Sequence, residues 1–296
     1  MGGKEYSPLM SNLFAPFDPD TEEPRRRRFK PIPVRVLLPN LVTLLSLCLG
    51  LTAIRLAVES KLELAIAAIV LAAVLDALDG RIARFLQSTS RFGAELDSLA
   101  DFVNFGVAPA IILYFWGLSA LHSAGWIAVL VFAICTSLRL ARFNVMLDDP
   151  NKPPYAGNFF VGVPAPAGAL IVMLPVYLEL IGLPRTGVSP AFALVYVIGV
   201  ALLMVSSLPT WSGKRVSARV PRDYVLPIFV LVVLLVALLV SYPWELLTAG
   251  TFAYLGCIPF AYMHYKKLER AHLAAAPGGI PHAPDVEEAE RPNRLN

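Results

Sequence analysis

The sequence predicts an all-α protein: a polytopic membrane helix bundle with about eight transmembrane helices. Of the 296 residues, 56% are hydrophobic and only 16% are charged, whereas soluble domains carry about 25% charged residues. The apolar residues gather in stretches of roughly 20, the length that an α-helix needs to cross a bilayer. Basic residues cluster between alternate pairs of these stretches. Together, these features argue against a soluble globular enzyme.

The predicted transmembrane segments follow one another with short polar connections. The last two are joined by residues 242–245, where a proline cannot continue the helix. The fifth contains Pro164, Pro166 and Pro175, so we expect it to be kinked. The predicted segments are residues 35–56, 62–85, 94–117, 124–143, 160–181, 190–208, 224–241 and 246–264.

The two ends of the chain differ in composition from the membrane domain, which we predict at residues 33–265. Residues 1–32 include the basic run Arg25 to Arg28, and residues 266–296 are rich in Pro, Gly and charged side chains. Neither segment has enough apolar residues to form a core, so both are predicted to be disordered tails. The 3 cysteines lie within apolar stretches, which indicates no disulfide or zinc framework.

The distribution of Lys and Arg predicts how the helices are oriented. If eight helices place both ends of the chain on one side, that side holds most of the 25 basic residues. Arg55, Lys61 and Arg185 would lie on the opposite side. Because basic residues concentrate on the cytoplasmic side of membrane proteins, the sequence predicts that both termini are cytoplasmic.

Four aspartates stand out within the second and third predicted helices. A carboxylate inside a membrane helix is costly and usually has a function. Asp76 and Asp79 are three residues apart and Asp97 and Asp101 are four apart, so each pair shares a helix face. The short connection makes the two helices antiparallel neighbours. Both pairs then lie near the cytoplasmic end and can face one another.

Carboxylates this close repel one another unless cations are bound or protons are retained. Oxygen ligands select hard cations such as Mg²⁺ or Mn²⁺, and two such ions about 4 Å apart can stabilise phosphoryl transfer. The sequence therefore predicts a divalent-metal site with Asp76, Asp79, Asp97 and Asp101 as candidate ligands. Two alternatives remain: a structural salt-bridge network with nearby arginines, and an ion pathway in an ion-coupled membrane transporter.

Small and basic residues border the aspartates. Gly80 directly follows Asp79, Ala83 lies one turn later, and Arg84 can neutralise a phosphate from the same helix. A diphosphate can approach the backbone closely only where side chains are small. Gly93 opens the third helix and permits close helix contact or ligand approach. The pattern favours a phosphate-containing ligand beside the metal ligands.

The four aspartates and the residues between them resemble, at every position, the signature of the CDP-alcohol phosphotransferases. The matching pattern is Asp76-x2-Asp79-Gly80-x2-Ala83-Arg84-x8-Gly93-x3-Asp97-x3-Asp101. The resemblance implies a six-helix catalytic core, a CDP-linked substrate and divalent metal, Mg²⁺ or Mn²⁺, as two ions. It implies that the first three aspartates bind metal and that the last is the general base, which can also touch metal. Gly80, Ala83 and Arg84 would line the site of the CDP moiety.

A second pattern, Pro39-Asn40-x2-Thr43, begins the first predicted helix. Asn40 and Thr43 lie one turn apart and would face the bundle, and the pattern resembles part of the family's nucleotide site. Helix capping explains the bare pattern equally well. With the family resemblance, Asn40 and Thr43 become candidate residues for binding the CDP moiety.

Four further stretches extend beyond the signature, at residues 97–109, 137–144 and 160–166 and more loosely at 204–214. They resemble the corresponding parts of bacterial phosphatidylserine synthases. That resemblance implies transfer of the phosphatidyl group of CDP-diacylglycerol to the hydroxyl of L-serine, with release of CMP. It also implies a bacterial inner membrane location and a homodimer. Glycerol 3-phosphate and inositol remain alternative acceptors.

Serine needs a cation for its carboxylate and oxygen atoms for its ammonium group. Arg139 and Arg142 lie three residues apart at a helix end on the active-site side, and each can bind a carboxylate in a forked geometry. They could instead set topology or extend toward the membrane surface. Asn104 and Asn144 can supply amide oxygens. The sequence thus proposes Arg139, Arg142 and Asn144 as acceptor-binding residues, with Asp101 as the base.

Overall fold

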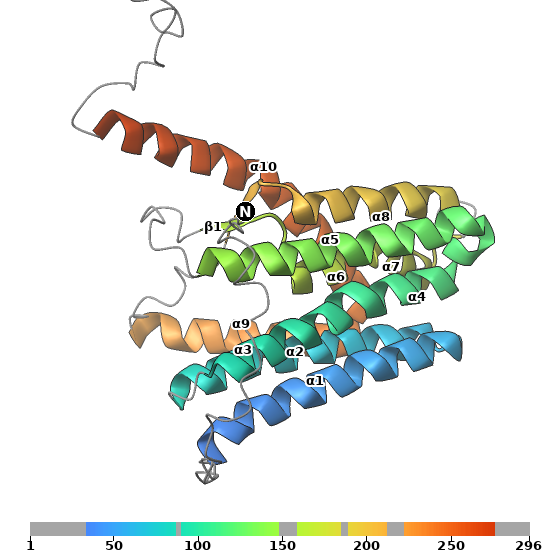
Figure 1. Ribbon diagram of the computed structural model, residues 1–296, viewed down its shortest axis with the longest axis horizontal. Coiled ribbons are helices and arrows are strands. Elements are labelled where there is room, and N and C mark those ends of the chain that lie inside the picture. Colours follow the sequence, from blue (N-terminus) through green and yellow to red (C-terminus); the bar gives the residue numbers. More distant parts are fainter. Residues whose placement is uncertain (1–33, 87–89, 148–158, 185–188, 212–221, 276–296) are drawn as a thin grey trace, which may run out of the picture. The chain divides into compact units, whose positions relative to one another are not determined.

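The computed structural model describes residues 34–86, 90–147, 159–184, 189–211 and 222–275. Within these ranges the chain forms helices joined by short connections, together with two short strands that pair with each other (Figure 1). The all-α membrane bundle predicted from the sequence is confirmed, with this strand pair as the exception. The predicted N-terminal tail, with its arginine run, and the C-terminal stretch after residue 275 lie outside the described residues.

Each predicted transmembrane segment corresponds to helical structure, and most boundaries shift by only a few residues; the start of the fifth segment and the end of the last differ more. The helices are α1 (Val34–Val58), α2 (Leu62–Phe85), α3 (Arg91–Asp101), the π-helix η1 (Phe102–Val107), α4 (Ala108–Trp116), the short 3₁₀ helix η2 (Leu118–Leu121), α5 (Ser123–Leu147), α6 (Ala165–Val172), α7 (Leu174–Leu180), α8 (Pro190–Val205), α9 (Arg222–Ser241) and α10 (Pro243–Ala275). The strands are β1 (Phe159–Val161) and β2 (Pro209–Trp211).

Five of the described helices are long and apolar enough to cross a membrane, and they make the chain an integral membrane protein. Three more of the predicted spans correspond to α2, to α6 with α7, and to α8. α2 is long but carries the charged residues of the signature, and α8 is apolar but shorter. The five long spans are Leu37–Val58, Arg91–Trp116, Ser123–Met146, Tyr224–Ser241 and Pro243–Leu268.

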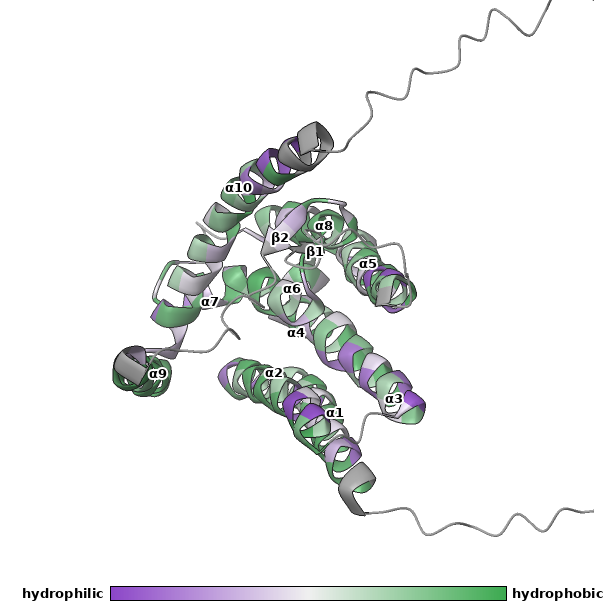
Figure 2. Ribbon diagram, turned by 90° about the vertical axis from the view of Figure 1, so that its left-hand side faces the viewer, coloured by the Kyte–Doolittle hydropathy of each residue, from purple (hydrophilic) through white to green (hydrophobic). Residues whose placement is uncertain are grey.

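Large apolar side chains cover the outside of the bundle. On α9, Leu226, Phe229 and Leu234 are 72%, 68% and 52% exposed. Figure 2 shows α9 largely hydrophobic, whereas hydrophilic residues gather on α3 and on the distal part of α10. Exposed apolar surface on this scale is unusual in soluble proteins and is what helices in contact with lipid require.

The interior is built around α5. This helix packs along α8 and against η1 and α4. Phe132 of α5, Phe105 of η1 and Met204 of α8 are fully buried at these contacts. The acid-bearing helix α3 continues directly into η1 and α4, so the site is anchored to the best-packed part of the molecule.

The fifth predicted segment, residues 160–181, is broken as its prolines predict. α6 ends at Val172 and α7 begins at Leu174, with Pro175 in its first turn. A proline is tolerated there because its missing N–H would have no partner within the helix. The predicted kink is therefore confirmed.

The start of that segment is a strand, so the helix prediction is wrong there. Residues 159–161 form β1, which pairs antiparallel with β2, and Phe160 lies opposite Thr210. The pairing joins two of the stretches that resemble phosphatidylserine synthases. It also brings the end of α8 beside the start of α6.

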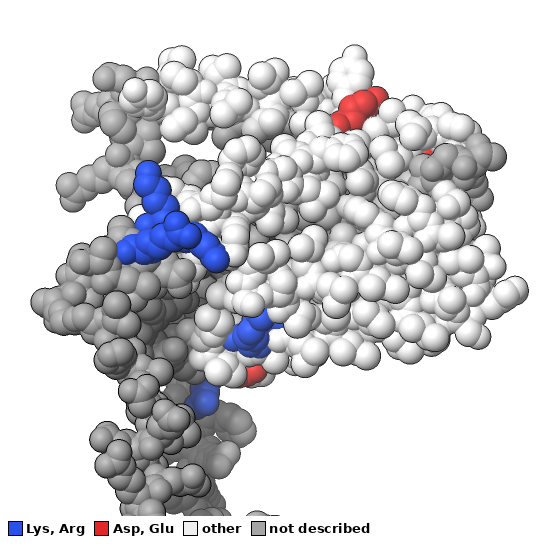
Figure 3. All heavy atoms as spheres, turned by 90° about the horizontal axis from the view of Figure 1, so that it is seen from above, with Lys and Arg blue, Asp and Glu red and all other residues white. Residues whose placement is uncertain are grey.

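α10 continues to Ala275, beyond the predicted end of the membrane domain at residue 265. Lys266, Lys267 and Leu268 are good helix formers, so the first part of the predicted tail is helical. On the face that Figure 3 presents, the Lys and Arg side chains of the described residues lie toward one end.

Candidate active site

Three carboxylates from two adjacent helices come together on the α2–α3 hairpin. Asp76, Asp97 and Asp101 each offer one oxygen atom, and these atoms all lie within 4.8 Å of one another. Asp76 comes from α2 and the other two from α3, and all three are partly buried. The expectation that the two pairs of aspartates face one another is confirmed for these three residues.

The start of α3 determines where its acids lie. Ser90 caps the helix, and its Oγ accepts a hydrogen bond from the Gly93 backbone N–H at 3.0 Å, a common way to satisfy a free amide at a helix start. Asp97 and Asp101 then follow one turn apart on a shared face. The cap therefore fixes the start of the helix that carries both carboxylates.

Asp79 lies one turn along α2 from Asp76 but outside the group of three. Its Oδ2 accepts a hydrogen bond from the Thr43 hydroxyl at 2.7 Å, and the residue is only 4% exposed. The Thr43 hydroxyl also lies 3.1 Å from the Pro39 carbonyl oxygen within α1. The Asn40–Thr43 pattern, whose role the sequence left open, thus holds a signature carboxylate in place.

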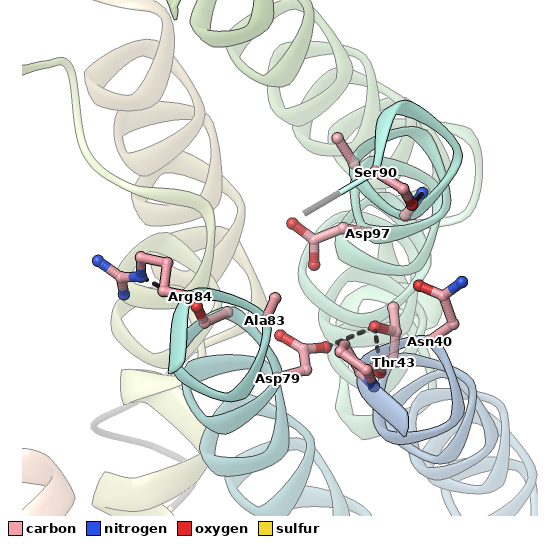
Figure 4. Close-up of a pocket in the computed structure, with 11 residues that line it drawn as sticks. Asn40, Thr43, Asp79, Ala83, Arg84, Ser90 and Asp97 are labelled. Atoms are coloured by element: carbon pink, nitrogen blue, oxygen red, sulfur yellow. Dashed lines mark hydrogen bonds between the residues drawn. The ribbon is translucent and has the colours of Figure 1, made fainter. Parts of the chain in front are cut away.

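A pocket of about 540 Å³ lies between α1, α2 and the start of α3 (Figure 4). Small-molecule pockets are commonly about 300–1,000 Å³, so a nucleotide fits this volume. All five residues that the sequence assigns to the CDP moiety line this pocket. The lining residues are Pro39, Asn40, Thr43, Asp79, Gly80, Ala83, Arg84, Ser90, Gly93, Ala94 and Asp97.

The two signature glycines have different surroundings. A Cβ at Gly80 would meet no atom within 4 Å, so the backbone is open there. A Cβ at Gly93 would lie 2.9 Å from Asn40 Oδ1, so this glycine permits close contact between α3 and α1. Arg84 is exposed, and its Nε donates a hydrogen bond to the Gly80 carbonyl oxygen at 2.9 Å. Figure 4 shows its guanidinium turned away from Asp79.

Comparison with known proteins agrees with this geometry. Residues 36–205 match the CDP-alcohol phosphatidyltransferase family, and residues 223–259 match the family described as CDP-alcohol phosphatidyltransferase 2. The chain belongs to the CDP-alcohol phosphatidyltransferase family. The first match spans α1 to α8 and contains six of the predicted membrane segments, in agreement with a six-helix core.

Three similar proteins share one name. The chain is 42% identical over 277 residues to the CDP-diacylglycerol–serine O-phosphatidyltransferase of Mycobacterium leprae, which covers 93% of this chain and 90% of that protein. It is 44% identical over 225 residues to the protein of the same name from Mycobacterium tuberculosis, covering 76% of this chain and 78% of that protein. The protein of that name from Helicobacter pylori is 34% identical over 238 residues, or 80% of this chain and 96% of that protein.

The acidic group has the chemistry that a divalent cation requires in a CDP-alcohol phosphatidyltransferase. Asp76, Asp97 and Asp101 offer only oxygen donors, which Mg²⁺ and Mn²⁺ prefer. Within the described part of the chain, Asp101 Oδ1 is buried without a hydrogen-bond partner. Such an atom is costly unless an ion or ligand contacts it. The residues therefore fit a bound divalent metal, with Asp79 beside them on α2.

Arg142 is held by backbone carbonyl groups. Its guanidinium donates hydrogen bonds to the carbonyl oxygens of Val205 at 2.6 Å, Ser206 at 3.0 Å and Val161 at 3.1 Å. Gly162 has a φ of +78°, and a Cβ there would lie 3.0 Å from Arg142 Nη2, so glycine is needed at this approach. These bonds join α5 to β1 and the end of α8. They give Arg142 a structural role, and its contact with the acceptor carboxylate stays a prediction.

Arg139, one turn earlier on α5, faces the acids instead. It is 6% exposed, and its Nε has no hydrogen-bond partner among the described residues. The guanidinium carbon lies 5.3 Å from the centroid of the Phe143 ring, a cation–π contact. Arg139 interacts electrostatically with Asp101. Binding of the acceptor by Arg139 stays a prediction as well.

The two asparagines that the sequence singled out make internal contacts. Asn144 Nδ2 donates a hydrogen bond to Ser98 Oγ at 2.9 Å, which joins α5 to α3 beside the acids. Asn104 of η1 is 1% exposed, and its Nδ2 donates to Ser46 Oγ of α1 at 2.9 Å. Both residues position the acid-bearing helix. Contact between the Asn144 amide oxygen and the acceptor stays a prediction.

Sequence reasoning missed Thr210 and Tyr254. The Thr210 hydroxyl of β2 donates to the Gly162 carbonyl oxygen at 2.8 Å, and α10 packs against β2. Tyr254 of α10 has a buried hydroxyl that lies near Thr210 but makes no hydrogen bond of regular geometry within the described ranges. The one available signal was that Thr210 lies in the stretch 204–214. An aromatic residue in an apolar helix, such as Tyr254, gives no comparable sign.

Proposed function

We propose that this chain transfers the phosphatidyl group of CDP-diacylglycerol to the hydroxyl of L-serine, giving phosphatidylserine and CMP. The observation that carries the proposal is the group of Asp76, Asp97 and Asp101, which shares Asp97 with a nucleotide-sized pocket. The acids and the pocket support phosphoryl chemistry on a nucleotide-linked substrate. The names of relatives that align along most of the chain support serine as the acceptor.

The pocket between α1 and α2 receives the CDP moiety. Asn40 and Thr43 line it from α1, and Gly80, Ala83 and Arg84 line it from α2. The open backbone at Gly80 admits a diphosphate, and Arg84 supplies positive charge beside it. The acyl chains remain in lipid, against the exposed apolar faces of the helices.

The aspartates hold divalent metal, Mg²⁺ or Mn²⁺ as two ions, with Asp76, Asp79, Asp97 and Asp101 as the ligands. When bound, the metal neutralises charge on the diphosphate. Thr43 keeps the buried Asp79 carboxylate pointed toward the pocket through its 2.7 Å hydrogen bond. The chain thus supplies the negative charge that the cations require, at the end of the CDP site.

Asp101 acts as the general base and accepts the proton of the serine hydroxyl. The serine oxygen then forms a bond to the phosphorus on the lipid side of the diphosphate. The bond from that phosphorus to the bridging oxygen breaks, and CMP leaves with the electron pair. A single displacement is favoured because Ser98, the hydroxyl nearest the acids in sequence, is engaged by the Ala94 carbonyl oxygen and by Asn144.

The decisive experiment is release of CMP from CDP-diacylglycerol by the purified protein. Serine, glycerol 3-phosphate and inositol are supplied in turn, and the lipid product is identified by mass spectrometry. Serine-dependent CMP release with formation of phosphatidylserine is expected. CMP release that depends on another acceptor would support the reaction type but change the proposed acceptor. No CMP release with any acceptor would refute the proposal that this protein is such an enzyme.

We also propose that the active site and both termini face the cytoplasm of a bacterial inner membrane, and that the protein is a homodimer like related enzymes. The gathering of basic side chains at one end in Figure 3 supports this orientation. Cysteines placed at Lys267 and Lys61 should react with impermeant thiol reagents only from opposite sides. Mass measurement in detergent tests the dimer.

A further inference from the structure

Five buried side-chain polar atoms lack hydrogen-bond partners within the described part of the chain, and three of them come from three different helices around the acids. These three are Asp101 Oδ1 from α3, Arg139 Nε from α5 and the Tyr254 hydroxyl from α10. Native proteins leave few such atoms unpaired, and those that remain commonly contact water, an ion or a ligand. One of the three is an acceptor, and the other two are donors.

Arg139 links the other two side chains electrostatically. Arg139 interacts electrostatically with both Asp101 and Tyr254. No ion pair shorter than 4 Å joins Arg139 to Asp101, although both residues are described. Opposite charges in the interior that do not contact each other directly can be bridged by a small polar molecule. Such a molecule could satisfy all three atoms at once.

The hydrogen-bonding character of the three atoms restricts which molecule can pair with them. Asp101 Oδ1 accepts, so it pairs with a hydroxyl that donates. Arg139 and Tyr254 donate, so they pair with a group that accepts. The positive charge of Arg139 favours an anion there and repels an ammonium group. A β-hydroxy amino acid meets this requirement with its hydroxyl toward Asp101 and its carboxylate toward Arg139. Inositol offers no anion.

We propose that Tyr254 determines acceptor specificity by donating a hydrogen bond, beside Arg139, to the carboxylate of the acceptor amino acid. The inference rests on the proposed function and names the acceptor group that this residue recognises. α10 lies outside the first family match at residues 36–205, and Tyr254 falls within the second match at residues 223–259. The last helix pair takes part in choosing the acceptor, while the helices of the first match carry the acids.

Steady-state kinetics of Tyr254→Phe test the inference, because this change removes one hydroxyl and keeps the ring. The KM for serine should rise about tenfold, as expected for loss of a hydrogen bond to a charged group. The KM for CDP-diacylglycerol should change less than about twofold. Tyr262→Phe is the matched control, since Tyr262 lies on the same helix, is 37% exposed and contacts Lys266 through its ring.

The unaltered enzyme supplies a second test that needs no variant to fold. Serinol keeps the hydroxyl and ammonium groups of serine but has a hydroxymethyl group in place of the carboxylate. Its kcat/KM should lie about a hundredfold below that of serine, because two donors lose an anionic partner. In Tyr254→Phe, the difference in kcat/KM between serine and serinol should be smaller than in the unaltered enzyme.

The outcomes separate the two proposals. No serine-dependent CMP release from the unaltered enzyme would overturn the proposed function, and the inference with it. Serine turnover with an unchanged serine KM in Tyr254→Phe would overturn the inference alone. Equal turnover of serine and serinol by the unaltered enzyme would also overturn it, whether or not Tyr254→Phe folds.

Discussion

Replacing Arg142 with lysine should destabilise the protein more than it weakens substrate binding. The guanidinium donates to carbonyl oxygens of Val205, Ser206 and Val161 at 2.6, 3.0 and 3.1 Å. Lysine keeps the charge, but its single nitrogen cannot reproduce a planar fork that reaches both α8 and β1. Loss of one or two such bonds, at about 1.5–3 kcal/mol each, should lower the free energy of unfolding by about 2–4 kcal/mol.

Thermal unfolding of the purified protein in detergent measures this loss. The Tm should fall by about 5–10 °C for a chain of this size. Arg55→Lys is the control, since Arg55 forms an exposed ion pair with Glu59 at 2.8 Å, and such pairs contribute about 0–1 kcal/mol. Below its unfolding temperature, Arg142→Lys should bind serine almost normally. An unchanged midpoint together with a raised KM for serine would refute the structural role and restore Arg142 as a carboxylate ligand.

Three further changes test the site. Asp101→Asn should reduce turnover by about 10²–10⁴-fold while metal-dependent CDP binding, measured by calorimetry, persists; near-normal turnover would exclude Asp101 as the base. Thr43→Val removes the donor to the buried Asp79 and should raise the KM for CDP-diacylglycerol about tenfold. Thr52→Val, which removes a hydroxyl bonded to the Cys48 carbonyl oxygen on the same helix, should leave that KM unchanged, and equal effects of both would argue against a role for Thr43. EDTA should abolish CMP release and added Mg²⁺ or Mn²⁺ should restore it; activity that survives excess chelator would contradict the metal site.

The sequence is most informative where neighbours along one helix decide the outcome. Asp97 and Asp101 share a face because four residues make about one helical turn, and the structure places both beside Asp76. Asn40 and Thr43 line one pocket for the same reason. These placements need only helical periodicity and a short connection between α2 and α3, and both can be read from the residues themselves.

Contacts between distant segments could not be predicted in this way. Arg139 and Arg142 are equivalent by spacing, but carbonyl groups 19, 63 and 64 residues away from Arg142 hold its guanidinium. Those carbonyl groups belong to β1 and to the residues at the end of α8. The strands are only three residues long, too short to show the alternation of side chains that predicts a strand. The difference between the two arginines therefore arises only when the tertiary structure forms.

The position of Asp101 itself depends on contacts deeper in the bundle. η1 begins directly after it, and π-helical turns inside longer helices often lie at functional sites. Asn104 of η1 donates a hydrogen bond to Ser46 of α1 at 2.9 Å, and Ser46 donates to the Ala72 carbonyl oxygen of α2 at 2.9 Å. A Cβ at Gly50 would collide with Asn104 Oδ1, so glycine leaves the space that this side chain fills. These bonds tie η1, α1 and α2 together one turn below the acids. The spacing of the carboxylates thus follows from residues that have no part in the chemistry.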